Sequence, residues 1–159
     1  MNRNLEWLIT SLMAFALGLL LGSIWHAAYG TELVVPGVFN PKVTQDNIKD
    51  TICKPGWTGT VRPPISYTSA LKRVQMKGLG YIDDPFNYEE DHFIPLELGG
   101  HPTAPGNLWP QPWDATNPCS AHVKDQDENA LNNAVCRRLI SLKVARQSIA
   151  DKWLHCKRP

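Results

Sequence analysis

Residues 88–101 read YEEDHFIPLELGGH, and this stretch decides how the middle of the chain folds. The apolar residues of HFIPLEL (92–98) predict a strand, and Pro95 restricts that strand to a sheet edge or a bulge. The Gly-Gly pair that follows begins a long loop rich in Pro and Gly. Asp91-His92 therefore stands at the start of an expected strand, ahead of a connection whose polar groups need partners.

Helices are expected on both sides of this stretch. Residues 120–139 and 141–154 carry apolar side chains at helical spacing, and Ser141 can cap the second of these helices. Upstream, the pattern predicts a short helix over 44–53 and another that begins at position 66 or 68 and runs through 77. The order is helix, loop, helix, short β-hairpin, helix, helix. This order predicts a small α+β domain that is mainly helical.

The first thirty residues differ in kind from the rest and predict export. An apolar segment, residues 8–28, is long enough to cross a bilayer, which takes about 20 apolar residues. Small residues at its end also fit a cleaved secretory signal. Arg3 precedes the segment and the next basic residue is Lys42, so the positive-inside tendency places the remainder outside.

We therefore expect three parts in the chain. Residues 1–30 are a signal peptide or one N-terminal hydrophobic helix that acts as a transmembrane anchor, 31–42 are a linker, and 43–159 form the exported domain. The domain is expected in the periplasm or outside the cell, as a monomer. If residues 8–28 are not cleaved, they hold it at the inner membrane.

All four cysteines follow the apolar segment: Cys53, Cys119, Cys136 and Cys156. An even number of cysteines in an oxidising compartment indicates disulfides, and four cysteines allow three pairings. The sequence alone does not choose among them; we expect Cys53 with Cys136 and Cys119 with Cys156.

Charge is distributed unevenly, although the formal net charge is only +1. No Lys or Arg occurs between Gly78 and Val123, where seven carboxylates lie. The last part of the chain reverses this balance, with basic residues outnumbering Asp151: Arg137, Arg138, Lys143, Arg146, Lys152, Lys157 and Arg158. An acidic middle suits a cation and a basic end suits a polyanion such as nucleic acid or anionic lipid, although two solvated faces explain the same pattern.

The Asp91-His92 pair has a direct chemical use. Asp91 can bind a hard divalent cation through oxygen, and a neutral His92 can take a proton from water. Asn107 offers a second oxygen ligand, and Glu128 can complete or orient the shell. A metal ion opposite a general base is an arrangement that hydrolyses phosphodiesters.

These residues resemble a known family. EDHFIPLELGGHPTAPGNLWPQPW, followed by a helix with KDQDEN, is similar to an HNH-type endonuclease of the ββα-metal (His-Me finger) superfamily, within a small exported bacterial group. The upstream stretch TICKPGWTGTVRPPISYTSALK (51–72) belongs to the same pattern, and the resemblance spans roughly residues 43–153.

The resemblance implies roles for individual residues. His92 matches the general base, Asp91 the neighbouring metal ligand, and Asn107 a residue that binds metal in some members and braces the loop in others. The last His of the pattern has no clear counterpart, so Glu128 is preferred as third ligand and His122 comes second. Oxygen donors of this kind favour Mg²⁺ or Mn²⁺.

The implied substrate is nucleic acid, with DNA favoured over RNA. Arg62 and Lys124 are candidates to hold flanking phosphates, and the basic C-terminal segment can extend the contact. Two other functions stay open. One is a non-catalytic envelope domain that binds nucleic acid or a protein on the same scaffold. The other, weaker one is a tethered structural protein whose basic end lies on anionic lipid.

Overall fold

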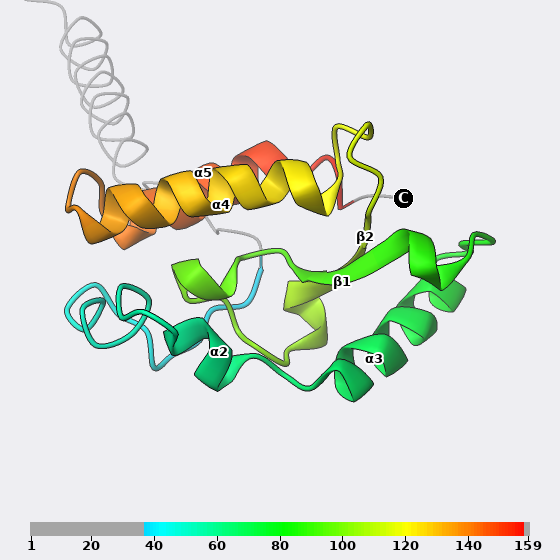
Figure 1. The fold of residues 1–159 in the computed structure, drawn as a ribbon, viewed down its shortest axis with the longest axis horizontal. Helices are drawn as coiled ribbons and strands as arrows, with labels where there is room; N and C mark the ends of the chain where they lie inside the picture. Colours follow the sequence, from blue (N-terminus) through cyan, green and yellow to red (C-terminus); the bar gives the residue numbers. More distant parts are fainter. Residues whose placement is uncertain (1–36, 158–159) are drawn as a thin grey trace, which may run out of the picture. The chain divides into compact units, whose positions relative to one another are not determined.

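The computed structural model describes residues 37–157, which form an α+β domain (Figure 1). Its α-helices and strands are, in chain order, α2 (Trp57–Val61), α3 (Ile65–Gly78), β1 (Tyr88–His92), β2 (Leu108–Pro112), α4 (Ala121–Cys136) and α5 (Leu142–Trp153). Short 3₁₀ turns lie between them: η2 (Pro85–Asn87), η3 (Leu96–Leu98) and η4 (Pro105–Asn107). The predicted α+β class is confirmed, and α3, the β-hairpin, α4 and α5 follow one another in the predicted order.

The two strands pair antiparallel, with Asp91 opposite Trp109 and His92 opposite Leu108. Helices α4 and α5 pack together on one side of the strands, and α3 contacts both strands from the other side (Figure 1). The hairpin therefore lies between two helical layers, and residues that alternate along β1 point toward different layers.

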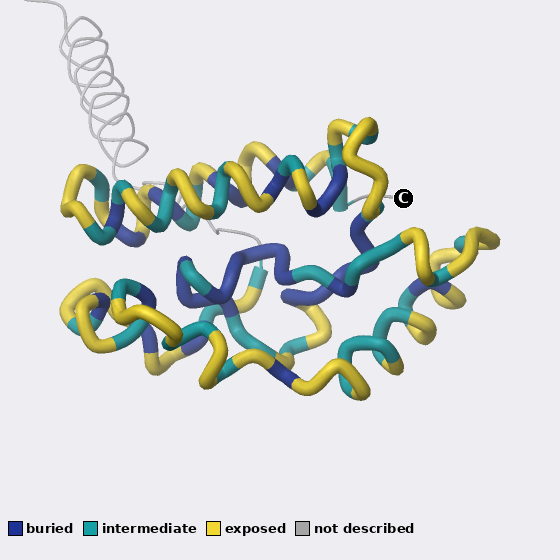
Figure 2. The backbone as a smooth tube through the Cα atoms, viewed as in Figure 1, coloured by how far each residue is buried: buried dark blue, intermediate teal, exposed yellow. Residues whose placement is uncertain are grey.

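The strand predicted over 92–98 is wrong in its position, because β1 ends at His92. Phe93, Ile94 and Leu98 are completely buried, so the apolar run is a core segment and not an alternating surface strand. The chain bends after His92 and then forms η3, which ends at Gly99 with a φ of 72°. Figure 2 shows the central part of the chain as mostly buried, and within residues 93–98 only Glu97 is half-buried.

Helices α3, α4 and α5 occur close to the predicted positions. The Ser120 hydroxyl accepts a hydrogen bond from the Val123 backbone N–H, and Ser141 accepts one from Val144, which confirms the cap predicted at Ser141. The helix predicted over 44–53 is wrong: the segment is a run of turns with i to i+3 hydrogen bonds, such as Asp50 N–H to Asn47 O. Ile48 and Ile52 from this segment are nevertheless buried.

Two disulfides join segments that are far apart in the sequence. Cys53 is bonded to Cys136 on α4, and Cys119 is bonded to Cys156 after α5. These are the expected pairs, and two disulfides are consistent with an exported protein in an oxidising compartment.

The described part of the chain begins inside the segment expected as a linker. Phe39 forms an isolated bridge with Gly100, and the Asn40 N–H donates to Gly99 O. The domain therefore starts before position 43. The expected signal peptide or anchor, residues 1–30, lies outside the described residues, as does Arg158. Within residues 37–157, no helix combines the length and apolar character needed to cross a membrane.

Candidate functional site

His92 is fixed at the end of β1 by the fold around it. The residue is 4% exposed, and Nε2 lies 2.9 Å from the carbonyl oxygen of Pro102. A carbonyl can only accept, so Nε2 carries the hydrogen, and the neutral ring keeps its lone pair on Nδ1. Burial lowers the pKa of His92, although the Pro102 carbonyl and the charge of Asp91 oppose this. The ring is therefore neutral near pH 7, as a general base requires.

His92 lines a cavity of about 240 Å³ between β1 and the start of α3. The cavity is lined by Arg62, Pro63, Ile65, Thr68, Ser69, Lys72, Glu89, Glu90 and His92. A larger cavity of about 530 Å³ borders the Cys119–Cys156 disulfide, but it has neither Lys nor Arg in its wall. The smaller cavity is the better candidate because it joins a neutral imidazole to two cations.

The two cations of this cavity come from different elements. Arg62 directly follows α2 and is exposed. Lys72 lies on α3, and its ammonium donates to the carbonyl oxygen of Tyr88 at 2.5 Å. That bond uses one of three N–H groups, so the ammonium keeps donors for an anion in the cavity.

Asp91 points to the other layer, where it meets Lys124 of α4. The Lys124 ammonium donates to Asp91 Oδ2 at 2.7 Å, to the carbonyl oxygen of His92 at 2.8 Å, and to Glu128 Oε1. The Lys124 side chain is fully buried, while those of Asp91 and Glu128 are 15% and 14% exposed. Lys124 was expected on a surface that meets phosphates; the structure places it inside instead.

Electrostatics keep this lysine charged. Burial alone lowers the pKa of Lys124, but the charges of Asp91 and Glu128 and the hydrogen bonds to them outweigh it and raise the pKa above its ordinary value. Burial also raises the pKa of Glu128, with Asp91 and Glu97 adding to the effect and Lys124 opposing it. One cation is thus shared by two carboxylates.

Further carboxylates surround this pair. Burial, Asp91 and Asp125 raise the pKa of Glu89 to about 7, and burial and Asp125 raise that of Glu97. Glu90, which lines the His92 cavity, is 8% exposed, and neither of its carboxylate oxygens has a hydrogen-bond partner among the described residues. Burial raises its pKa to about 8. Four of the seven carboxylates in the acidic middle, Glu89, Glu90, Asp91 and Glu97, are therefore buried or half-buried, whereas Asp83, Asp84 and Asp114 are exposed.

Asn107 is completely buried and braces the loop between the strands. Its Oδ1 accepts from the backbone N–H groups of Ile94 and Val38, at 3.0 and 3.4 Å. Its Nδ2 donates to the carbonyl oxygens of Ile94 and His101, at 3.0 and 3.2 Å. The amide that was expected to offer a metal ligand is engaged with backbone on both ends.

The expected ligands therefore do not fit a divalent cation as they are arranged. Asp91 and Glu128 share the Lys124 ammonium, and the Asn107 oxygen already accepts two N–H groups. His122, the second choice for a ligand, is exposed, and its ring lies against Trp113 with centroids 4.3 Å apart.

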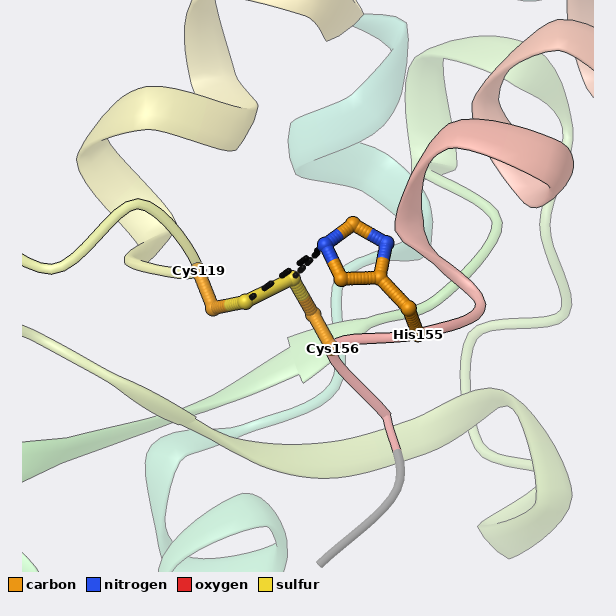
Figure 3. A group of neighbouring side chains, drawn as sticks. All are labelled: Cys119, His155 and Cys156. Carbon is orange, nitrogen blue, oxygen red and sulfur yellow. Dashed lines mark hydrogen bonds between the residues drawn. A yellow bond between two sulfur atoms is a disulfide. The ribbon is translucent and has the colours of Figure 1, made fainter.

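Within residues 37–157, one group of three ligand-type side chains brings its ligand atoms within 4.8 Å of one another: Cys119, His155 and Cys156. Figure 3 shows that the two sulfurs are joined and that His155 leans against them, with Nε2 3.2 Å from Cys156 Sγ and 4.0 Å from Cys119 Sγ. These residue types suit zinc, but a disulfide has no thiolate to offer.

The basic C-terminal segment is partly used inside the domain. Arg146 donates to the carbonyl oxygens of Leu98, Val43 and Gly99, and burial lowers its pKa to about 10. Lys157 donates to Gly106 O. Arg137, Arg138 and Lys143 are exposed, so the surface available to a polyanion is smaller than the sequence indicates.

The sequence reasoning missed Lys72 and Glu90. Lys72 ends the quoted stretch 51–72, yet it was not singled out, because its place in the cavity depends on how α3 packs on β1. Glu90 has a local signal: it lies two residues before His92, and such residues share a face of a strand.

Comparison with known proteins adds nothing to this geometry. No family model, no curated protein and no solved structure matches the chain.

Proposed function

We propose that this chain is an exported endonuclease that hydrolyses phosphodiester bonds of nucleic acid on a ββα (His-Me finger) scaffold, with DNA as the favoured substrate. One observation carries the proposal: His92 lines the same cavity as Arg62 and Lys72. A neutral base beside two cations is the combination that attack on an anionic phosphodiester needs.

In the proposed step, the lone pair on His92 Nδ1 removes a proton from a water molecule, and the water oxygen attacks phosphorus. The bond from phosphorus to the leaving oxygen breaks, and that oxygen takes a proton from solvent. His92 becomes an imidazolium, which the Pro102 carbonyl and the charge of Asp91 favour. Asp91 thus supports the charged form of the base.

Arg62 and Lys72 are assigned to the phosphate. Both line the cavity, and charge-assisted hydrogen bonds from them neutralise the negative charge that grows on the phosphoryl oxygens during attack. The exposed Arg62 can also meet a neighbouring phosphate of the strand.

The resemblance also implies Mg²⁺ or Mn²⁺, but its expected ligands do not fit one as they stand, and we assign no step to a metal ion. A requirement for either ion stays a prediction of the resemblance, and the EDTA arm of the experiment below tests it.

A second function is favoured by the Asp91–Lys124–Glu128 contacts, which close the face of β1 that was expected to bind metal. On this alternative the domain binds nucleic acid or a protein without turnover.

The test is cleavage of plasmid DNA, and of RNA in a parallel assay, by the full chain in oxidised form, with Mg²⁺, with Mn²⁺ and with EDTA. We expect nicking that His92→Ala abolishes while circular dichroism shows a folded protein. Added imidazole should restore part of the cleavage, because it replaces the missing base and not a missing structural contact. If a folded wild type cleaves neither DNA nor RNA under any of these conditions, the nuclease proposal is rejected and the non-catalytic binding domain is the remaining function.

A further inference from the structure

Three oxygen atoms of the chain converge on one buried nitrogen. Asp91 Oδ2 and the His92 carbonyl oxygen come from the end of β1, and Glu128 Oε1 comes from α4. Carboxylate and carbonyl oxygens are the ligands that hard divalent cations prefer. The nitrogen at their centre is the ammonium of Lys124, so the chain itself supplies a cation to an oxygen-lined position.

We infer that the Lys124 ammonium is the resident cation of this site and takes the position between Asp91, Glu128 and the His92 carbonyl that a divalent metal ion would need. The inference deepens the proposed function, and it rests on that function only for its cleavage readout. Its binding and stability readouts stand without any cleavage.

The fit of the ammonium supports this assignment. An ammonium has three N–H groups, and the three oxygen atoms accept one each, so no donor of Lys124 is left over. The side chain is fully buried, and a buried charge is kept only when it is paired in this way.

The position of the lysine on α4 explains why it reaches both carboxylates. Lys124 and Glu128 are four residues apart, so they share one face of the helix, and that face packs against the end of the hairpin. Because the ammonium also holds the His92 carbonyl, Lys124 is a positioning residue for the backbone that carries the base.

A divalent ion has two other routes to this region, and both are disfavoured. It can displace the ammonium, which leaves a charged lysine buried beside a doubly charged ion. It can also bind outer carboxylates such as Glu89, Glu97 and Asp125. Within residues 37–157, however, no three carboxylates bring ligand atoms within 4.8 Å of one another.

The experiment measures Mn²⁺ binding and thermal unfolding on the full chain in oxidised form. Free Mn²⁺ is followed by electron paramagnetic resonance, and unfolding by circular dichroism with EDTA, Mg²⁺ or Mn²⁺. For the wild type we expect no binding of Mn²⁺ at millimolar concentration and the same Tm in all three conditions.

Two variants make the test specific. In EDTA, Lys124→Ala should lower Tm by roughly 10 °C or more, because it leaves two mostly buried carboxylates without their cation. Mn²⁺ should bind this variant and recover part of the lost Tm, since the oxygen atoms and the space of the lysine side chain become available. Combining Lys124→Ala with Asp91→Asn should remove that recovery.

Saturable Mn²⁺ binding by the wild type that Asp91→Asn removes would overturn the inference. Lys124→Ala that folds and gains no affinity for Mn²⁺ would also overturn it. If Lys124→Ala does not fold in any condition, the comparison of Mn²⁺ binding by the wild type and by the single variant Asp91→Asn decides alone.

The cleavage assay distinguishes a failure of this inference from a failure of the proposed function. Wild-type cleavage in EDTA supports both. Cleavage that requires a metal bound through Asp91 overturns the inference and keeps the nuclease. Absence of cleavage together with absence of Mn²⁺ binding keeps the inference and removes the nuclease.

Discussion

The Nε2 atom of His92 lies 2.9 Å from the carbonyl oxygen of Pro102, ten residues further along the chain. This contact holds the imidazole ring of His92, at the end of β1, against the loop that begins with Gly99 and Gly100. It also decides which nitrogen acts as base, because a nitrogen that donates to a carbonyl cannot accept a proton from water.

The pH dependence of cleavage follows from the burial of this ring. The pKa of His92 is lowered, so the ring stays neutral at a lower pH than a solvated imidazole does. We expect the acid limb of kcat/KM to fall below about pH 6.5, the ordinary value for histidine. Initial rates of plasmid nicking across the pH range measure it. An acid limb above that value would mean that another group, or a charged His92, governs the step.

A close approach of the backbone explains why position 100, the second of the Gly99–Gly100 pair, is a glycine. A Cβ at this position would lie 1.7 Å from the carbonyl oxygen of Ile94 and 2.8 Å from Asn107 Nδ2. Gly100→Ala must therefore push the braced loop apart, and we expect a loss of at least about 2 kcal/mol in the free energy of unfolding.

Gly106→Ala in the same loop is the matched control. A Cβ there would meet only Val38 Cγ2, at the ordinary contact distance of 3.5 Å, so a change within about 1 kcal/mol is expected. Urea unfolding of the two variants compares them. Equal stability of the two would show that the loop yields at Gly100 and that the close approach is not a constraint.

Local sequence rules predicted α3, α4 and α5 better than they predicted the strand or the segment 44–53. Ser141 and the apolar spacing after it are short-range signals, and α5 begins where they indicate. The apolar run after His92 carries no such signal: Phe93 and Ile94 are buried from all directions, and only tertiary packing distinguishes a core segment from a strand.

In the candidate site, too, short-range signals were visible in the sequence and contacts made by tertiary packing were not. Asp91-His92 is visible as a motif, and the strand pairing explains how it is held. Lys124 was expected to meet phosphates at the surface, because spacing along a helix does not show which face of the helix is covered. Its contact with Asp91 joins residues 33 positions apart, and no rule based on neighbouring residues predicts such a contact.

The two disulfides should contribute to stability by similar amounts. They close loops with sequence separations of 83 and 37 residues, and loop closure depends only on the logarithm of loop length. Removing either pair by double Cys→Ser substitution should cost about 2–4 kcal/mol, with less than about 1 kcal/mol between them. Urea unfolding of Cys53→Ser/Cys136→Ser and Cys119→Ser/Cys156→Ser measures both. A midpoint unchanged in either variant would contradict this expectation.

Glu90 makes stability depend on pH. Burial raises its pKa from 4.5 to about 8, while Lys72 on α3 opposes the shift and Asp91 adds to it. Between these two pH values the folded state holds a proton that the unfolded state has lost. The free energy of unfolding contributed by Glu90 therefore falls as pH rises through this window, and it is unaffected below about pH 4.5.

Glu90→Gln removes that charge and keeps the size of the side chain. We expect the variant to gain about 1–3 kcal/mol relative to wild type at about pH 8, and little at about pH 5. Asp50→Asn, at an exposed position, is the control and should change stability by less than about 0.5 kcal/mol at both values. Urea unfolding of the three proteins at the two pH values gives the comparison. A gain that is equal at both pH values would mean that Glu90 does not change its protonation on unfolding, and that its carboxylate is paired in solution.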